Sequence, residues 1–218
     1  QYFISTHSSV FLDATYVDSV FLTQYQDKIT VSNATSRSII LNELGYTIAD
    51  NLVSDLIILT EGPSDIPVIQ HFLDLLGLYG LYNIKLWPLG GDIMDKVDLS
   101  IFAEKNNIIA LIDTDTTSDP IRRKFIRLCD EKGIKHYRLI RYSIENYFTL
   151  EAIKSVFKGQ VSDSITEIDP NKKLSDQLKW DIKKRNGKIA KAMTLDDIIE
   201  TDLYGFLMMV KNILENQA

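Results

Sequence analysis

Short apolar runs alternate with amphipathic segments from residue 55 onward, and this alternation predicts an α/β fold with a parallel sheet. Leu56–Leu59 is an unbroken apolar run, which is typical of a strand covered on both faces. Gly62-Pro63 interrupts the chain, and apolar residues then recur at helical spacing from Ile66 to Leu76. Similar patterns predict further strands at 83–88, from 107 to the acid at 113, and at 136–142, with helices at 99–104, 120–131 and 150–157.

The flanking segments have different patterns. Two alternating, β-rich runs at 17–22 and 28–31 predict a hairpin, and Ser36–Asn51 carries its apolar residues on one helical face. Near the other end, a polar loop is expected at 159–170, a basic helix at 172–186 and a final amphipathic helix at 203–214. We therefore predict two parts, 1–54 and 55–218, the second with a basic helical insertion at 158–195.

Acidic residues follow three of the predicted strands. Glu61 ends the first strand, Asp113 and Asp115 end the third, and Glu145 follows the fourth together with Ser143. Parallel strands end at one edge of a sheet, where open α/β sheets build their sites. Residues two apart on a strand point to the same side, so a pair of acids there is unfavourable unless cations or protons compensate the charge. Oxygen ligands of this kind suit Mg²⁺ or Mn²⁺ rather than zinc.

Several of these residues have a second interpretation. Glu61 and Asp65 are metal ligands or caps of the following helix, and both roles are compatible for Asp65. Asp119 ligates through water or caps the helix that Pro120 begins. The Gly90-Gly91 turn allows a close approach to a phosphate but is equally a plain turn. The basic residues of the helix at 120–131 neutralise a phosphate or form a solvated face: Arg122, Arg123, Lys124 and Arg127.

Composition and charge refine this interpretation. The chain of 218 residues is 45% hydrophobic and 25% charged, which is ordinary for a globular protein. It contains no apolar run of about 18 residues, no signal segment, and one cysteine, Cys129, so we expect a cytoplasmic protein without a membrane span. The net charge is −6, but residues 172–191 carry +6 and the remainder therefore carries −12. An acidic centre beside a basic arm suits a polyanion held through cations.

The motifs resemble those of a TOPRIM domain, the metal-dependent module of topoisomerases, primases and certain nucleases. Within this group the chain is most similar to the OLD (overcoming lysogenization defect) family nucleases. The matching segments are Glu61–Asp65, Gly90-Gly91, Asp113–Asp115, Ser143–Tyr147 and Gly187–Ala190. The resemblance implies a TOPRIM (Rossmann-like) fold, with a central parallel sheet of about four strands flanked by helices, an N-terminal hairpin and helix extension, and a helical C-terminal part.

The resemblance also implies roles for individual residues. Glu61, Asp65 and Asp113 are expected to hold one Mg²⁺ or Mn²⁺ ion, and Asp115, Ser143 and Glu145 a second. Glu61 and Asp113 are the expected catalytic acids. Lys188 matches the lysine that stabilises the transition state, although Lys183, Lys184 and Lys191 lie close by. Contacts with DNA are expected from the basic insertion: Lys179, Lys183, Lys184 and Arg185.

The first residues resemble part of a different module. Tyr2–Ile4 followed by His7 is similar to the last strand and switch histidine of ABC-type ATPases, which OLD proteins place before the TOPRIM domain. No Gly-x-x-x-x-Gly-Lys-Ser/Thr loop occurs in these residues. We therefore expect residues 1–54 to be the remnant of an ATPase domain followed by a linker helix. The chain would then be part of a longer ATPase-nuclease, and ATP would bind only to that longer protein. The expected partners are DNA and the ATPase domain, and pairing into a homodimer is left open.

The leading prediction is a divalent-metal-dependent DNA endonuclease or nickase that acts by two-metal phosphodiester hydrolysis. In the longer parent chain, ATP would regulate it and its role would be defence against phage. Two alternatives stay open. One is a TOPRIM module of a topoisomerase or primase, and the other is a catalytically idle domain that binds DNA or a protein partner, for which binding would not depend on metal ions.

Overall fold

The computed structural model describes residues 21–25, 28–33, 54–97, 99, 107–116 and 119–216. The chain divides into two compact units, Gln1–Val53 and Ser54–Ala218. His7 and the predicted helix at 36–51 lie outside the described residues, as does most of the predicted helix at 99–104. No helix in the described ranges is long and apolar enough to cross a membrane.

In the first unit the predicted hairpin is present, with different strand ends. Strand β1 (Phe21–Tyr25) pairs antiparallel with β2 (Ile29–Asn33), and Tyr25 lies opposite Ile29. The first strand was expected to end at Leu22, but Thr23 and Tyr25 favour extended structure and continue the ladder, which shortens the turn.

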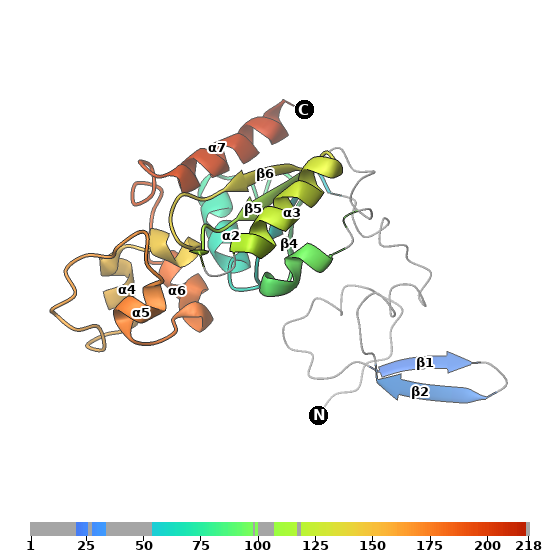
Figure 1. Cartoon of the computed structure of the whole chain (residues 1–218), viewed down its shortest axis with the longest axis horizontal. Coiled ribbons are helices and arrows are strands. Elements are labelled where there is room, and N and C mark those ends of the chain that lie inside the picture. The colour runs from blue at the N-terminus through green and yellow to red at the C-terminus, as the bar shows by residue number, and fades with distance from the viewer. Residues whose placement is uncertain are drawn as a thin grey trace. The chain divides into compact units, whose positions relative to one another are not determined.

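The second unit contains a four-stranded parallel sheet with the order β4-β3-β5-β6 (Figure 1). Its strands are β3 (Leu56–Thr60), β4 (Ile84–Pro88), β5 (Ile108–Ile112) and β6 (Lys135–Arg138). All residues of the two central strands, β3 and β5, are buried, as their unbroken apolar runs predict. The predicted α/β fold with about four parallel strands is confirmed.

The chain winds in opposite directions from the two central strands. Strand β3 continues through helix α2 (Ile66–Leu75) to β4, and β5 continues through α3 (Asp119–Glu131) to β6 on the other side. Because such crossovers are right-handed, α2 and α3 cover opposite faces of the sheet. The boundary between β3 and β5 is therefore the topological switch point, where α/β sheets open a crevice beyond the strand ends.

One large apolar cluster holds the sheet, α2 and the last helix together. Ile58 and Ile109 are neighbours in the β3–β5 ladder and pack in this cluster with Phe72 of α2. The final helix, α7 (Asp202–Glu215), adds Phe206, Val210 and other apolar residues, all of them buried. Burial of each such side chain contributes about 1.5–3 kcal/mol, so this cluster fixes the sheet that carries the strand ends.

Strand β6 is shorter than expected because the chain leaves the sheet after Arg138. Leu139 still donates its N–H to Ile112 O at 2.8 Å, and the hydroxyl of Thr114 donates to Leu139 O. Tyr142 N–H donates instead to Pro170 O. The following 3-10 turn, η6 (Ile144–Tyr147), therefore lies beyond the strand end, beside the residues that follow β3 and β5.

The basic segment is not the single helix predicted at 172–186. It consists of α5 (Leu174–Leu178), the 3-10 turn η7 (Lys183–Arg185) and α6 (Asn186–Ala190). Lys179 adopts a left-handed conformation, φ 71°, which ends α5 and turns the chain. Together with α4 (Leu150–Val156), these short helices form a group beside the sheet (Figure 1). A further 3-10 helix, η3 (Gly91–Lys96), follows β4.

Candidate active site

A cavity of about 420 Å³ lies beyond the carboxyl ends of β3 and β5, at the switch point of the sheet. All six residues predicted as metal ligands line it: Glu61, Asp65, Asp113, Asp115, Ser143 and Glu145. They reach the cavity from three places, namely the turn after β3, the segment after β5 and the η6 region. The structure thus brings together at one rim the acids that the strand pattern predicted there.

Glu61 is held by three hydrogen bonds. Its carboxylate pairs with Arg122 through two bonds, Nε to Oε1 at 2.7 Å and Nη2 to Oε2 at 2.5 Å. The Asp113 backbone N–H also donates to Oε1, at 2.8 Å. Both side chains are buried, with exposed fractions of 6% for Arg122 and 8% for Glu61. Breaking such a buried pair by removing one partner costs about 3–5 kcal/mol.

The carboxyl groups of Asp65 and Asp113 are held at raised pKa. Burial, reinforced by the charge of Glu145, raises the pKa of Asp65 to about 7 although the Gly62 N–H donates to it. Burial raises the pKa of Asp113 well above its usual range, and the charges of Glu61, Asp65 and Glu145 add to the effect. Burial is thus the first cause of both shifts, and repulsion between the neighbouring carboxyl groups adds to it.

Asp65 does not cap α2 with its side chain. It stands at the N-cap position, but its Oδ2 turns back to accept the Gly62 N–H at 2.8 Å, and Ser64 Oγ donates to Oδ1 at 3.2 Å. This tight loop holds the Asp65 carboxyl at the cavity. Pro67 in the first turn of α2 lacks an N–H, so one donor that a cap would satisfy is missing there.

The segment Ser143–Tyr147 is held by a hydrogen bond within itself and by bonds to two other parts of the fold. Ser143 Oγ donates to Glu145 Oε2 at 2.7 Å, which orients the acid. Asn146 donates to Asp169 O and Lys172 O and so fastens the start of the basic segment. Tyr147 O–H donates to Asp202 Oδ1 at 2.6 Å, at the start of α7. These contacts give each polar residue of the segment a specific position.

Asn186 completes the surroundings of Glu145 and was missed by sequence reasoning. It is fully buried at the start of α6, and its Nδ2 donates to Glu145 Oε1 at 2.9 Å. Its Oδ1 is buried and makes no hydrogen bond. A polar residue within a basic, exposed stretch gives no sequence signal of burial, so only the fold reveals this contact.

The two remaining acids lie differently. Asp115 lines the cavity, with its Oδ2 3.7 Å from Arg122 Nη2. Asp119 does not line it, because Arg138 and Arg123 bind its two oxygens at 2.5 and 2.6 Å. The pKa of Asp119 is lowered, and the hydrogen bond from Arg138 is the largest cause. Its role is therefore an ion pair at the start of α3. Asp181, an acid that the sequence interpretation did not assign, also lines the cavity.

Two lysines line the cavity, Lys173 and Lys183, and the predicted Lys188 is not one of them. Lys183 and Lys188 are both exposed, but only Lys183 borders the cavity, while Lys188 lies on α6 outside the lining. Burial acts to lower the pKa of Lys183, but the charges of Glu145, Asp65 and Asp113 outweigh it and the pKa is raised. Lys179, Lys184 and Arg185 are exposed and lie outside the lining.

Gly91 ties the end of β4 to the same rim. Its N–H donates to Glu61 O at 2.7 Å, and both Gly90 and Gly91 have positive φ, 91° and 66°. Side chains other than glycine rarely adopt these angles. The Gly90-Gly91 turn therefore serves to fasten the backbone that carries Glu61.

The donor chemistry of the cavity fits a hard divalent cation, because carboxylate and hydroxyl oxygens are what Mg²⁺ and Mn²⁺ prefer. In this conformation, however, no three His, Cys, Asp or Glu side chains of the described residues are grouped so as to hold a metal ion. Glu61, Asp65 and Glu145 are each turned to a donor of the protein, as given above, and Asp113 Oδ1 accepts the Ile144 N–H at 3.1 Å. An ion would bind at the remaining lone-pair directions of these oxygens or displace some of their present donors.

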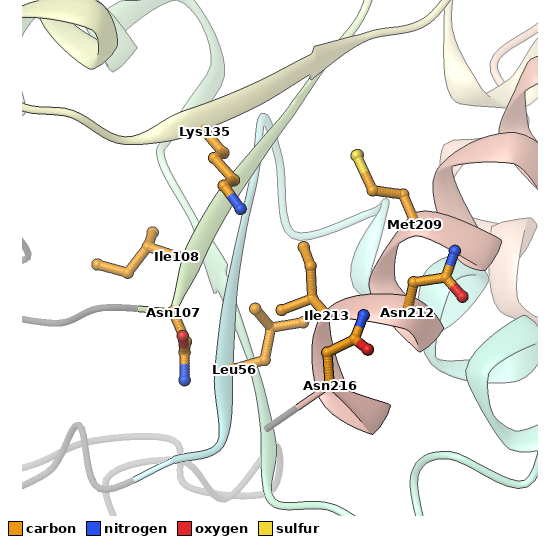
Figure 2. Close-up of a pocket in the computed structure, with 8 residues that line it drawn as sticks. All are labelled: Leu56, Asn107, Ile108, Lys135, Met209, Asn212, Ile213 and Asn216. Atoms are coloured by element: carbon orange, nitrogen blue, oxygen red, sulfur yellow. The ribbon is translucent and has the colours of Figure 1, made fainter. Parts of the chain in front are cut away.

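A second cavity, of about 280 Å³, lies at the opposite edge of the sheet (Figure 2). Its described lining comes from the first residues of the strands and from the end of α7: Leu56, Asn107, Ile108, Lys135, Met209, Asn212, Ile213 and Asn216. None of these eight residues is acidic. The chemistry therefore favours the cavity at the carboxyl edge as the functional site.

Comparison with known proteins adds a relationship in fold. The chain is similar to the C-terminal region of the Burkholderia pseudomallei OLD protein, at 16% sequence identity and a TM-score of 0.50, covering 75% of this chain and 97% of that one. It also matches the C-terminal region of the Xanthomonas campestris pv. campestris OLD protein, at 15% identity and a TM-score of 0.48, covering 76% and 98%. No protein-family model and no curated protein matches the chain. The chain therefore has the fold of the C-terminal region of the Burkholderia pseudomallei OLD protein.

Proposed function

We propose that residues 54–218 form a divalent-metal-dependent nuclease domain of the OLD type that cleaves phosphodiester bonds in DNA. One observation carries the proposal: acids that follow three separate strands line one cavity at the switch point, and two lysines, Lys173 and Lys183, line it as well. The motif resemblance and the similarity in fold agree with it. In a longer parent chain, an ATPase would regulate the domain in defence against phage.

Six residues would hold the ions, namely Glu61, Asp65, Asp113, Asp115, Ser143 and Glu145. Such ions, when bound, activate water and neutralise the charge that gathers on the phosphate. Ser143 and Asn186 orient the two oxygens of Glu145 through bonds of 2.7 and 2.9 Å. Burial raises the pKa of Asp65 and of Asp113, so protons would compete with the ions for these carboxyl groups.

We assign the phosphate contact to Lys183 in place of Lys188. Lys183 borders the cavity and is attracted to its acids, so its ammonium group is available to a phosphate oxygen that enters between them. The exposed residues Lys179, Lys184 and Arg185 extend the positive surface away from the cavity and would contact the backbone farther along the DNA.

The test is cleavage of supercoiled plasmid by the purified chain with Mg²⁺ or Mn²⁺. Asp113→Asn and Glu145→Gln should each lower the nicking rate on the order of a hundredfold or more, because each removes a charge that holds the ions. Glu151→Gln is the matched control, since Glu151 is exposed on α4 and is not a lining residue. Equal rates for all three variants would refute the assignment of the site.

A second candidate function is binding of DNA or a protein partner without catalysis. The observation that favours it is the buried Arg122–Glu61 pair, which compensates one acid of the cavity without any metal ion. The two functions differ in their response to chelation. Binding of labelled duplex DNA that is unchanged by EDTA, together with no cleavage in Mn²⁺, would favour this candidate.

A further inference from the structure

The pairing of Arg122 with Glu61 uses most of the bonding capacity of that carboxylate. A carboxylate offers about four lone-pair directions for hydrogen bonds or metal ligation. Oε1 accepts two bonds, from Asp113 N–H at 2.8 Å and from Arg122 Nε at 2.7 Å, and Oε2 accepts Arg122 Nη2. One direction, on Oε2, remains for any other ligand.

The position of the guanidinium adds an electrostatic effect. Arg122 Nη2 lies 3.7 Å from Asp115 Oδ2, and Nη1 lies 3.5 Å from Asp115 O. The group therefore stands between the acids that follow β3 and β5. Arginine stays protonated at every ordinary pH, and its side chain here is buried. A divalent ion that approaches these acids meets a fixed positive charge that water screens little.

We infer that Arg122 is a positioning residue that competes with divalent ions for Glu61 and so weakens the affinity of the acid cluster for them. The inference rests on the proposed metal-dependent function. It also explains why the lining acids are not grouped as a ready ligand set: Arg122 and the Asp113 N–H hold Glu61 in its present orientation.

The test is the dissociation constant for Mn²⁺, measured by isothermal titration calorimetry on the 218-residue chain after treatment with EDTA and gel filtration. Arg122→Gln removes the charge and the two-bond fork, and should bind Mn²⁺ roughly tenfold tighter or more. Arg122→Lys keeps the charge but loses the fork, and should lie between Arg122→Gln and the wild type.

Arg123→Gln is the matched control. It makes the same change in net charge one residue away, but Arg123 is exposed and pairs with Asp119 rather than Glu61. Its Mn²⁺ affinity should equal that of the wild type. Thermal unfolding with and without Mn²⁺ gives a second readout, because the midpoint of Arg122→Gln should fall in EDTA and rise more on adding Mn²⁺ than that of the wild type.

Tighter binding by Arg122→Gln with no change in Arg123→Gln would support the inference, and unchanged or weaker binding by a folded Arg122→Gln would overturn it. Should Arg122→Gln fail to fold, Arg122→Lys decides in the same way. A wild type that binds no Mn²⁺ would count against the proposed function. In that case, Mn²⁺ binding by the Arg122 variants would still support competition between Arg122 and divalent ions. If the Arg122 variants also bound no Mn²⁺, the inference would be overturned.

Discussion

At the scale of single residues, the site contains carboxyl groups whose pKa is higher in the folded chain than in the unfolded chain. The pKa of Asp65 is raised to about 7, from burial first and the charge of Glu145 second. Between about pH 4 and pH 7 the folded chain therefore holds a proton that the unfolded chain releases. The contribution of Asp65 to stability is thus present at low pH and is lost as the pH rises through 7.

The first prediction compares Asp65→Asn with the wild type in EDTA. The side chain of Asn cannot ionise, so the free energy of unfolding of the wild type, relative to the variant, should fall by on the order of 2 kcal/mol between pH 5 and pH 8. Denaturant titrations at several pH values measure this difference. A saturating concentration of Mn²⁺ should reduce the fall, since a bound cation favours the charged form.

Asp119→Asn is the control because its pKa is lowered, chiefly by Arg138. The stabilising contribution of Asp119 is complete above the pKa of the unfolded chain and is lost only at acid pH. The difference in free energy of unfolding between the wild type and Asp119→Asn should therefore stay constant between pH 5 and pH 8. A level difference for Asp65→Asn as well would show that Asp65 is already ionised across this range, and the repulsion described above would be wrong.

At the scale of elements, the site depends on how closely α6 approaches α2. Gly187 of α6 lies against Pro67 of α2, and a Cβ added at Gly187 would stand 2.9 Å from Pro67 Cβ. The neighbouring residue Asn186 donates to Glu145 Oε1 and, at 3.3 Å, to Ser64 O. The close approach of the two helices therefore sets the distance between the basic segment and the acids.

The second prediction is that Gly187→Ala destabilises the chain by about 1–3 kcal/mol, because a methyl group forced into this contact must push the helices apart. Gly80→Ala is the matched change, since a Cβ there meets nothing within 4 Å and the φ of Gly80 is not positive. It should be neutral or stabilise by up to about 1 kcal/mol. Chemical denaturation measures both, and equal effects would contradict the close packing.

At the scale of the whole molecule, the strand pattern predicted the sheet well because long apolar runs are a strong signal. The runs at Leu56 and Ile108 gave buried parallel strands, and the acids after them meet at one cavity. The strand order, and with it the switch point, depends on contacts between distant segments that no local pattern encodes. The same reason explains why Arg122, in a stretch that also reads as a solvated face, was not recognised as the partner of Glu61.

The basic segment shows a different limit of sequence reasoning. We predicted one basic helix at 172–186, but this segment is broken, and Leu174, Leu178, Ile182 and Ile189 all pack into the core. A left-handed turn at Lys179 breaks the helix and allows these apolar side chains to reach the core. Tertiary packing thus overrides local propensity here. The same break brings Lys183, rather than Lys188, to the cavity.

The last prediction concerns the independence of the larger unit. Among the residues that the structure describes, those of the large apolar cluster all lie between Leu56 and Leu214, and we expect the burial that stabilises the sheet to come from within residues 54–218. A chain of residues 54–218 alone should therefore unfold in one cooperative transition, with a midpoint within a few degrees of that of the 218-residue chain. Its heat-capacity change should be about 2 kcal/mol/K, from about 12–15 cal/mol/K per residue. Differential scanning calorimetry measures both quantities, and a broad transition or a much smaller heat-capacity change would show that residues before Ser54 complete the core.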